Sequence, residues 1–311
     1  MVGGNDWYNM GADDDPPMAN ELLLMLQDLR LSLPDVVTSA MLFVSSPIFY
    51  IGLPMTFAIF IFICVDKRSG EWMVMNLSVA SFVGHFLKDI IANPRPWITD
   101  ERITPDERAL KGAKGYSTPS GHSIDSTAGF GSVIAIFRRR WVTVLFIVII
   151  LTVMFSRLYL GVHTPLDIAT GALTAIFVII INRALLKTSY SDEHSYLMIS
   201  VIYALAFVTI TLLWILVTKN VNAVLKFGGL LLGAMIGRVI EHRFIGYEVK
   251  SVPMGKNICR LFIGLMIVGL SLIVPYALIN NSLSNSLGGF LAMIGLFVIA
   301  PMMIEKIGLN D

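Results

Sequence analysis

Between Ser195 and Thr218 the chain reads SYLMISVIYALAFVTITLLWILVT, a stretch without one charged side chain. A helix needs about 20 mostly apolar residues to cross a bilayer, and this stretch is long enough. A second uncharged stretch runs from Leu261 to Ile304; it is too long for one crossing, and the polar residues 280–286 divide it in two. These stretches predict transmembrane helices.

The composition of the whole chain agrees with this prediction. Of the 311 residues, 55% are hydrophobic and 14% are charged, whereas soluble domains carry about 25% charged residues. The net charge of +1 offers no surface for a polyanion. These values exclude a soluble globular protein, a disordered protein and a nucleic-acid binder. Cys64 and Cys259 indicate neither a disulfide framework nor a metal framework.

We predict an all-α fold, a polytopic transmembrane helix bundle with about nine spans. The first segment is interpreted as one long, kinked helix because Pro47 and Pro54 interrupt it. The predicted spans are residues 36–65, 72–92, 121–137, 141–158, 165–186, 196–217, 223–241, 258–279 and 287–305.

The chain divides into three predicted regions. Residues 1–35 form an N-terminal extracytoplasmic or interfacial segment, and residues 36–186 form a transmembrane core that carries the polar motifs described below. Residues 187–311 form an additional region of four spans. Within the first region, residues 20–33 mix leucines with charges, and two interpretations stay open: a helix in the membrane interface and a lid packed over the bundle.

Basic residues gather in the loops at one end of the predicted bundle. The positive-inside rule makes that end cytoplasmic and places the N-terminus on the outer side. The loop of residues 93–120 lies on the outer side and carries charges of both signs, which indicates a functional loop. The basic residues at the inner end are Lys67, Arg68, Arg138, Arg139, Arg140, Arg183, Lys187, Arg243, Lys250 and Lys256.

Three polar clusters fall at the ends of predicted spans on the outer face. Ionisable residues inside membrane helices are costly and are commonly functional. Together the clusters combine three cations, two imidazoles and a carboxylate, which predicts a site for an anionic substrate. They are Lys88 with Asn93-Pro94-Arg95-Pro96, then Pro119-Ser120-Gly121-His122, and Ser156-Arg157 with His163 and Asp167.

The local chemistry of these clusters fits phosphate. Ser120 and Thr164 are expected to cap two helices whose N-termini present free N–H groups to the same space, and Gly121 lets an anion approach the backbone. Charge-assisted hydrogen bonds to the anion are expected from Lys88, Arg95 and Arg157.

The two histidines have different predicted roles. His163 lies four residues before Asp167, so a tight turn lets the carboxylate orient the imidazole as a nucleophile. His122 can protonate the leaving oxygen. Two histidines and a carboxylate also fit a metal site. The three neighbouring cations would repel a divalent ion, so we predict no metal and no cofactor.

Four further residues are less specific signals. His85, one turn before Lys88, fits either a supporting role at the site or a packed neutral histidine. Asp125, one turn after His122, is open between a site role and a structural role. Arg238 and Glu241 are three residues apart and are interpreted as a structural ion pair.

The three clusters resemble the signature of the type 2 phosphatidic acid phosphatase (PAP2) superfamily. That signature is Lys, six residues, Arg-Pro; then Pro-Ser-Gly-His; then Ser-Arg, five residues, His, three residues, Asp. Every position is matched, and the resemblance covers residues from about 40 to 185. The predicted span number is similar to that of the sphingosine-phosphate phosphatase and glucose-6-phosphatase branches.

The resemblance implies a PAP2-like core with a metal-independent, phosphohistidine mechanism. His163 would be the nucleophile, Asp167 would orient it, and His122 would act first as acid and then as base. The implied reaction is hydrolysis of a lipid phosphate or pyrophosphate at the extracytoplasmic face, on the plasma membrane or in the lumen of the endoplasmic reticulum. The implied phosphate-binding residues are Lys88, Arg95, Ser120, Gly121 and Arg157.

Alternative functions remain open at this stage. The same site could pass a phosphoryl group to another lipid, and a transporter or scramblase could bind lipid phosphate without turnover. A soluble sugar phosphate is a third candidate. The predicted partners are a lipid phosphate substrate and the bilayer, with no nucleic acid; the sequence does not indicate which lipid or which oligomeric state.

Overall fold

The computed structural model describes residues 18–279 and 281–311, so residues 1–17 of the predicted N-terminal segment and Asn280 of the polar turn lie outside the described residues. Every regular element in the described part is a helix, as predicted. The elements, with η marking a π-helical turn, are α1 (Met18–Ser32), α2 (Asp35–Val44), η2 (Ile48–Gly52), α3 (Leu53–Phe60), η3 (Ile61–Val65), α4 (Lys67–Ile91), α5 (Pro96–Thr99), α6 (Glu107–Leu110), α7 (Gly121–Phe137), α8 (Arg140–Tyr159), α9 (Pro165–Ser189), α10 (Glu193–Thr218), α11 (Val221–Ile240), η4 (Glu241–Ile245), α12 (Met254–Ile279), α13 (Ser282–Ile294), η5 (Gly295–Ile299) and α14 (Ala300–Lys306).

The protein is an integral membrane protein. In the described part of the chain, seven helical segments are long and apolar enough to cross a membrane. The predicted spans 121–137 and 223–241 correspond to α7 and α11, which are not among these seven. The predicted number of nine spans therefore stays a prediction.

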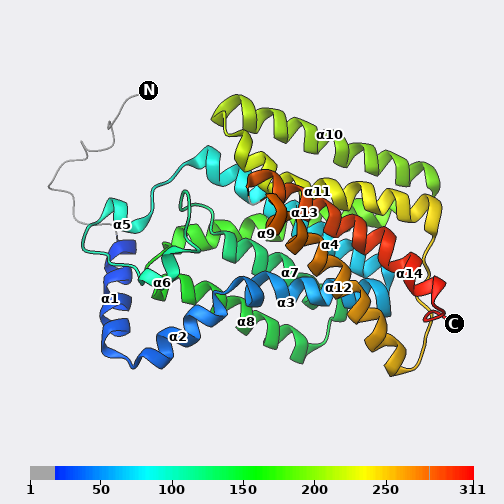
Figure 1. Cartoon of the computed structure of the whole chain (residues 1–311). Coiled ribbons are helices and arrows are strands. Elements are labelled where there is room, and N and C mark those ends of the chain that lie inside the picture. Colours follow the sequence, from blue (N-terminus) through cyan, green and yellow to red (C-terminus); the bar gives the residue numbers. More distant parts are fainter. Residues whose placement is uncertain (1–17, 280) are drawn as a thin grey trace.

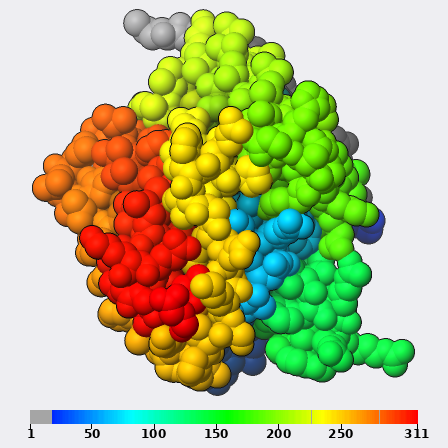
Figure 2. All heavy atoms as spheres, turned by 90° about the vertical axis from the view of Figure 1, so that its right-hand side faces the viewer, coloured from blue at the N-terminus to red at the C-terminus, as the bar shows by residue number. Residues whose placement is uncertain are grey.

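The long helices run side by side, and their connections alternate between the two ends of the bundle (Figure 1). Helix α4 is central, because it contacts α7 and α9 on one side and α11 on the other. Figure 2 looks onto one end, where the sky-blue start of α4 lies between the yellow α11 and the green helices. The motif-bearing helices α7, α8 and α9 thus form one group, and α11, α12 and α13 form a second.

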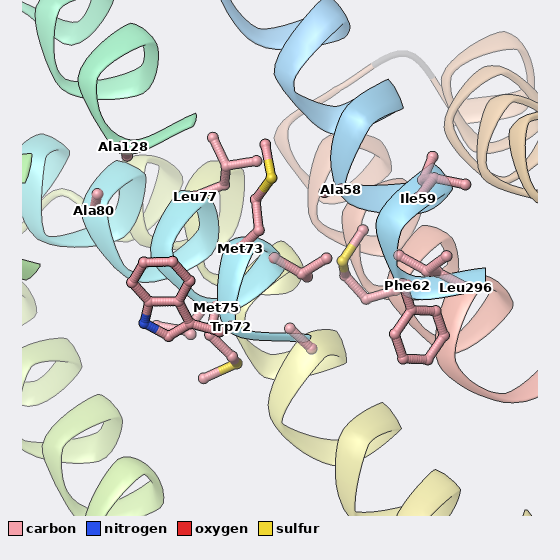
Figure 3. Close-up of a cluster of buried hydrophobic side chains, with 14 of the residues drawn as sticks. Ala58, Ile59, Phe62, Trp72, Met73, Met75, Leu77, Ala80, Ala128 and Leu296 are labelled. Atoms are coloured by element: carbon pink, nitrogen blue, oxygen red, sulfur yellow. The ribbon is translucent and has the colours of Figure 1, made fainter. Parts of the chain in front are cut away.

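The interior is built from apolar side chains that pack between α3, η3 and α4 (Figure 3). Phe62, Met73 and Leu77 are among its fully enclosed members. In the second group, α11 and α13 approach closely at Gly229 and Gly233. A Cβ atom on Gly229 would lie 2.0 Å from a backbone oxygen of α13, so only glycine allows this packing of two membrane helices.

The first predicted span is one candidate membrane segment, Asp35–Val65, as expected. It is interrupted after α2, at Ser45 and Ser46, directly before Pro47. Since proline cannot continue the hydrogen-bond ladder of the preceding turn, the interruption occurs where the sequence predicts it. The break brings the backbone of Ser45 to the outer end of the bundle core, which matters for the site below.

Helix α1 lies across the outer ends of the long helices (Figure 1). One face docks on the bundle: Arg30 donates to the carbonyl oxygens of Tyr159 and Thr104, and Gln27 donates to that of Arg102 at 3.1 Å. These are the contacts of a lid. Placement in the membrane interface stays a prediction, supported by an exposed apolar stripe of Met18, Leu22, Met25 and Leu29.

At the opposite end, a buried ion pair connects the second helix group to the central helix α4. Arg238 on α11 donates to the Glu71 carboxylate on α4 at 2.6 Å, and both side chains are buried. The interpretation of Arg238 and Glu241 as an ion pair is wrong, because Glu241 instead accepts from Lys67 at 3.0 Å. The three-residue spacing did not indicate that Arg238 and Glu241 both face α4, where Arg238 meets Glu71 and Glu241 meets Lys67.

Candidate active site

The turn that precedes α9 holds the predicted nucleophile. Thr164 caps α9 with its side chain, Pro165 occupies the first turn, and Asp167 completes a capping box by accepting from the Thr164 N–H at 2.7 Å. The Thr164 cap and the Pro165 start were predicted, since Thr-Pro is a typical helix start, whereas the capping box with Asp167 was not. It places Oδ2 of Asp167 3.4 Å from Nδ1 of His163. The capping interaction and the orientation of the imidazole therefore depend on the same carboxylate.

The Asp167 carboxylate has further partners that the motif analysis did not identify. Ser117 donates to Oδ2 at 2.6 Å, and Thr118 donates to Oδ1. Ser117 and Thr118 come immediately before the Pro119-Ser120-Gly121-His122 motif. Two hydroxyl side chains beside this motif were the sequence signal from which these partners could have been identified. A carboxylate with this many donors is held in one position and stays an acceptor.

His163 is enclosed, with 1% of its surface exposed. Burial lowers the pKa of His163 well below its ordinary value; the Asp167 hydrogen bond opposes this, and the cations Arg95, Lys88 and Arg157 reinforce it. The imidazole is therefore neutral at neutral pH. Because Nδ1 faces a carboxylate and Nε2 accepts from Arg95 at 3.0 Å, the hydrogen-bond partners assign the proton to Nδ1. This tautomer leaves a lone pair on Nε2.

Arg95 and Lys88 hold the outer loop against this turn. Arg95 donates to the backbone oxygens of Val162 at 2.8 Å and Gly115 at 3.0 Å. Lys88 donates to the backbone oxygens of Tyr116 at 3.0 Å and Ser117 at 3.2 Å. The two predicted phosphate ligands thus also order the loop that joins two motifs.

Arg157 stands out because its charge has little compensation. The side chain is 1% exposed, and its Nε and Nη2 atoms have no hydrogen-bond partner in the described part of the chain. An enclosed guanidinium with unused donors is costly in the absence of an anion. Its neighbour Ser156 shares a 2.6 Å hydrogen bond with Ser45, at the break after α2.

The start of α7 differs from the prediction in one respect. Ser120 occupies the N-cap position of α7, but its side chain makes no capping hydrogen bond, and Oγ is enclosed without a partner in the described part. The Ser120 N–H instead donates to the backbone oxygen of Asp167 at 2.8 Å. The space beside Gly121 is open, as an approaching anion requires. The predicted convergence of the two helix starts is therefore present, with the Ser120 hydroxyl unused.

His122 has partners that the sequence did not indicate. Its Nε2 donates to the backbone oxygen of Ser45 at 3.1 Å, which leaves Nδ1 for proton exchange. The Tyr50 ring lies against the imidazole, with ring centres 4.0 Å apart. Both partners come from the broken first span, far away in the sequence and outside any motif. His85 stacks on Phe227 of α11 with ring centres 3.4 Å apart and is also among the residues that line the cavity beside the site. Both interpretations of His85 therefore stay open.

A cavity of about 650 Å³ opens beside these residues at the outer end of the bundle. Five of the predicted site residues line it, and Ser120, Arg157 and Asp167 are not among its lining residues. Helix α11 and the first residue of α13 add part of the wall through Asn222, Phe227 and Ser282. The predicted residues along the wall are Lys88, Arg95, Gly121, His122 and His163.

Two family models match this chain. Residues 71–191, which include all three motifs, match the PAP2 superfamily. The chain belongs to the PAP2 superfamily. Residues 225–311 match a second PAP2 model, described as a PAP2 superfamily phosphatase, transmembrane extension. The resemblance predicted from the motifs is confirmed, whereas the assignment to the sphingosine-phosphate and glucose-6-phosphatase branches stays a prediction.

Known proteins similar to this PAP2 chain act on different lipids by name. An undecaprenyl-diphosphatase of Sulfolobus acidocaldarius is 28% identical over 42% of this chain and 60% of its own length. A lipid A 4'-phosphatase of Bacteroides thetaiotaomicron is 30% identical over 30% of this chain and 42% of its own length. A lipid phosphate phosphatase delta of Arabidopsis thaliana is 23% identical over 51% of this chain and 40% of its own length.

These similarities span less than two thirds of each of the three relatives. No solved structure matches this PAP2 chain. Among residues 18–279 and 281–311, no group of three or more His, Cys, Asp or Glu side chains is gathered that could hold a metal ion. A metal-free mechanism stays a prediction.

Proposed function

We propose that this PAP2 protein is a phosphatase that hydrolyses a lipid phosphate or diphosphate through a phosphohistidine intermediate. The observation that carries the proposal is the His163–Asp167 pair, which leaves Nε2 of a neutral imidazole free of protons. In this proposal residues 36–186 are the catalytic core, and residues 187–311 complete the cavity wall. No cofactor takes part.

In the first step, the Arg95 guanidinium exchanges its hydrogen bond to Nε2 of His163 for one to a phosphoryl oxygen, and the freed lone pair of Nε2 attacks the phosphorus atom. A P–N bond forms, the P–O bond to the lipid breaks, and His122, which enters this step protonated on both nitrogens, gives its Nδ1 proton to the leaving oxygen. The charge on the three remaining oxygens is balanced by Arg95, Arg157 and Lys88, and by the N–H groups at the start of α7. The unused donors of Arg157 support this role, because an anion supplies their acceptor.

In the second step, His122 takes a proton from water, and the resulting hydroxide attacks phosphorus. The P–N bond breaks, inorganic phosphate leaves, and His163 is restored. Nδ1 of His122 is the exchanging nitrogen in this scheme, since Nε2 is engaged with the Ser45 carbonyl. Asp167 accepts from Nδ1 of His163 throughout and stabilises the cation that forms on the ring.

The substrate in this proposal enters from the lipid on the outer side, on the plasma membrane or in the endoplasmic reticulum lumen. Support comes from the position of the cavity at the ends of apolar helices and from the basic residues at the opposite end. A lipid tail can then remain in the bilayer while its phosphate reaches His163.

The proposal is tested by phosphate release from purified protein in detergent with EDTA present. The substrates are a polyprenyl diphosphate, phosphatidic acid, phosphatidylglycerol phosphate and a soluble sugar phosphate. We expect release from lipid substrates, loss of release in His163→Ala, and a ³²P-labelled protein trapped by acid quenching. His194→Ala is the matched control, since His194 is exposed at the other end of the bundle.

Three results would contradict parts of the proposal. Activity that chelation abolishes would contradict the metal-free mechanism. Full activity of His163→Ala would contradict the assignment of the nucleophile, and label transferred to an added lipid instead of water would identify a phosphotransferase. Wild-type protein that binds lipid phosphate without releasing phosphate would favour a transporter.

The face of the membrane is tested separately by thiol labelling in whole cells. In a background lacking Cys64 and Cys259, Glu101→Cys on the outer loop is compared with Arg139→Cys at the opposite end; both positions are exposed. We expect an impermeant reagent to label only the first. Labelling of only the second would reverse the proposed orientation.

A further inference from the structure

The cavity of about 650 Å³ beside His163 is called the catalytic cavity below. A second cavity, of about 420 Å³, lies at the opposite end of the bundle. Helices α4 and α7 contribute to both cavities. The catalytic cavity takes residues from the end of α4 and the start of α7, beside the start of α9, whereas the second cavity takes them from the start of α4 and the ends of α7 and α9. Figure 2 faces this end of the molecule. We call it the basic cavity.

The charges around the basic cavity are all of one sign. Four cationic side chains line it, and no Asp or Glu does. In the described part of the chain, none of the four forms an ion pair with a carboxylate. Like charges that share a cavity repel each other, so an anion between them is favourable. The four are Arg68, Arg138, Arg183 and Lys187.

The cavity also has aromatic walls, and one of the aromatic residues has a hydrogen-bond donor without a partner in the described residues. The Arg183 guanidinium lies 5.5 Å from the ring centre of Trp72, and that of Arg68 lies 4.8 Å from the ring centre of Tyr190. Such stacking orients the guanidinium groups. Trp72 is only 7% exposed, yet its Nε1 has no hydrogen-bond partner in the described residues. Because indole N–H is a donor only, its missing partner is an acceptor.

We propose that the basic cavity binds the phosphate headgroup of an anionic membrane lipid. The cavity offers donors and positive charge, which a phosphodiester matches. Its position at the ends of membrane helices places it at headgroup depth. Apolar side chains such as Ile136 and Leu186 are also part of its lining and suit the acyl chain of a bound lipid. The bound lipid belongs to the leaflet opposite the catalytic cavity, and the site does not depend on the proposed reaction.

The test is lipid retention measured by native mass spectrometry on the full-length protein. Phosphatidylglycerol, which is anionic, is compared with phosphatidylcholine, which is zwitterionic. The wild type is expected to retain phosphatidylglycerol preferentially. The variant Arg68→Gln/Arg183→Gln is expected to bind it roughly 10-fold or more weakly, since each basic residue adds a favourable increment at a membrane surface.

A matched control separates the cavity from the general positive charge of this end. Arg139→Gln/Arg140→Gln removes two charges from the same end without touching the cavity lining, and we expect phosphatidylglycerol retention close to that of the wild type. Equal losses in the two double variants, or no lipid preference in the wild type, would overturn the proposal. Displacement of the lipid by millimolar inorganic phosphate would show a free-anion site and overturn the lipid assignment.

A second pair of substitutions covers the case in which the first variant fails to fold. Arg138→Gln/Lys187→Gln changes two exposed cavity residues and leaves the aromatic stacking intact. The same loss of phosphatidylglycerol preference is expected. Catalytic activity, measured on any substrate that the wild type accepts, serves as the check of folding and is expected to stay unchanged.

Discussion

The Asp167 carboxylate caps the first turn of α9 and also lies 3.4 Å from Nδ1 of His163. One side chain therefore determines where the helix starts and how the imidazole is oriented. Ser117 and Thr118 hold that carboxylate from the outer loop, so the loop between the first and second motifs is connected directly to the third.

We expect Asp167→Asn to lower kcat by about 10³- to 10⁴-fold, because an amide no longer holds the required tautomer of His163. Steady-state phosphate release measures the change, and circular dichroism shows whether the helices persist. Ser117→Ala removes one donor to the carboxylate and is the control, with a much smaller expected effect. Activity of Asp167→Asn within about 10-fold of the wild type would contradict the role of Asp167 in the mechanism.

Arg157 should limit the stability of the ligand-free protein. Its enclosed guanidinium has two nitrogens without partners, and unpaired buried donors cost about 1–3 kcal/mol. We expect Arg157→Met to raise the thermal unfolding midpoint in detergent while phosphate release falls by about 10²-fold or more. Inorganic phosphate should stabilise the wild type and not the variant. A lower unfolding midpoint for the variant would show that Arg157 is compensated by another interaction.

The sequence was informative where function depends on local spacing. The four-residue separation of His163 and Asp167, with Thr164-Pro165 between them, predicts both the helix start and the pairing that the structure contains. Five of the eight predicted site residues also line one cavity, at the helix ends that the alternation of helices indicates. Periodicity and motif spacing are sufficient for such features because they lie within one turn or one helix end.

The rest depends on packing between distant segments. Ser45 and Tyr50 contact His122 only because the break after α2 brings the first span to the start of α7. Ser120 has the ideal residue type for a cap, yet its side chain does not make the capping bond, since its backbone is fixed against α9. No spacing rule within one sequence encodes these tertiary contacts.

Asp125 is expected to influence which headgroups the protein accepts. It lines the catalytic cavity and is 5% exposed, and Oδ1 has no hydrogen-bond partner in the described part of the chain. A carboxyl oxygen in that position suits a hydroxyl group of the substrate. We therefore expect Asp125→Asn to raise KM for phosphatidylglycerol phosphate roughly 10-fold, with little change for phosphatidic acid. Equal losses on both substrates would indicate a structural role instead.

The Glu71–Arg238 pair should anchor the second helix group without taking part in the reaction. Arg238 donates to Glu71, Ser200 and Ser189, so removing its guanidinium leaves a buried carboxylate and two hydroxyls without their partner. We expect Arg238→Met to lower the free energy of unfolding by about 3–5 kcal/mol, and Glu71→Met/Arg238→Met to recover most of that loss. Denaturant titration in detergent measures both.

Because the pair lies at the end opposite the catalytic cavity, the folded fraction of each variant should keep the wild-type kcat. A double variant no more stable than Arg238→Met would show that the hydroxyl contacts, and not the ion pair, hold α11 against α4.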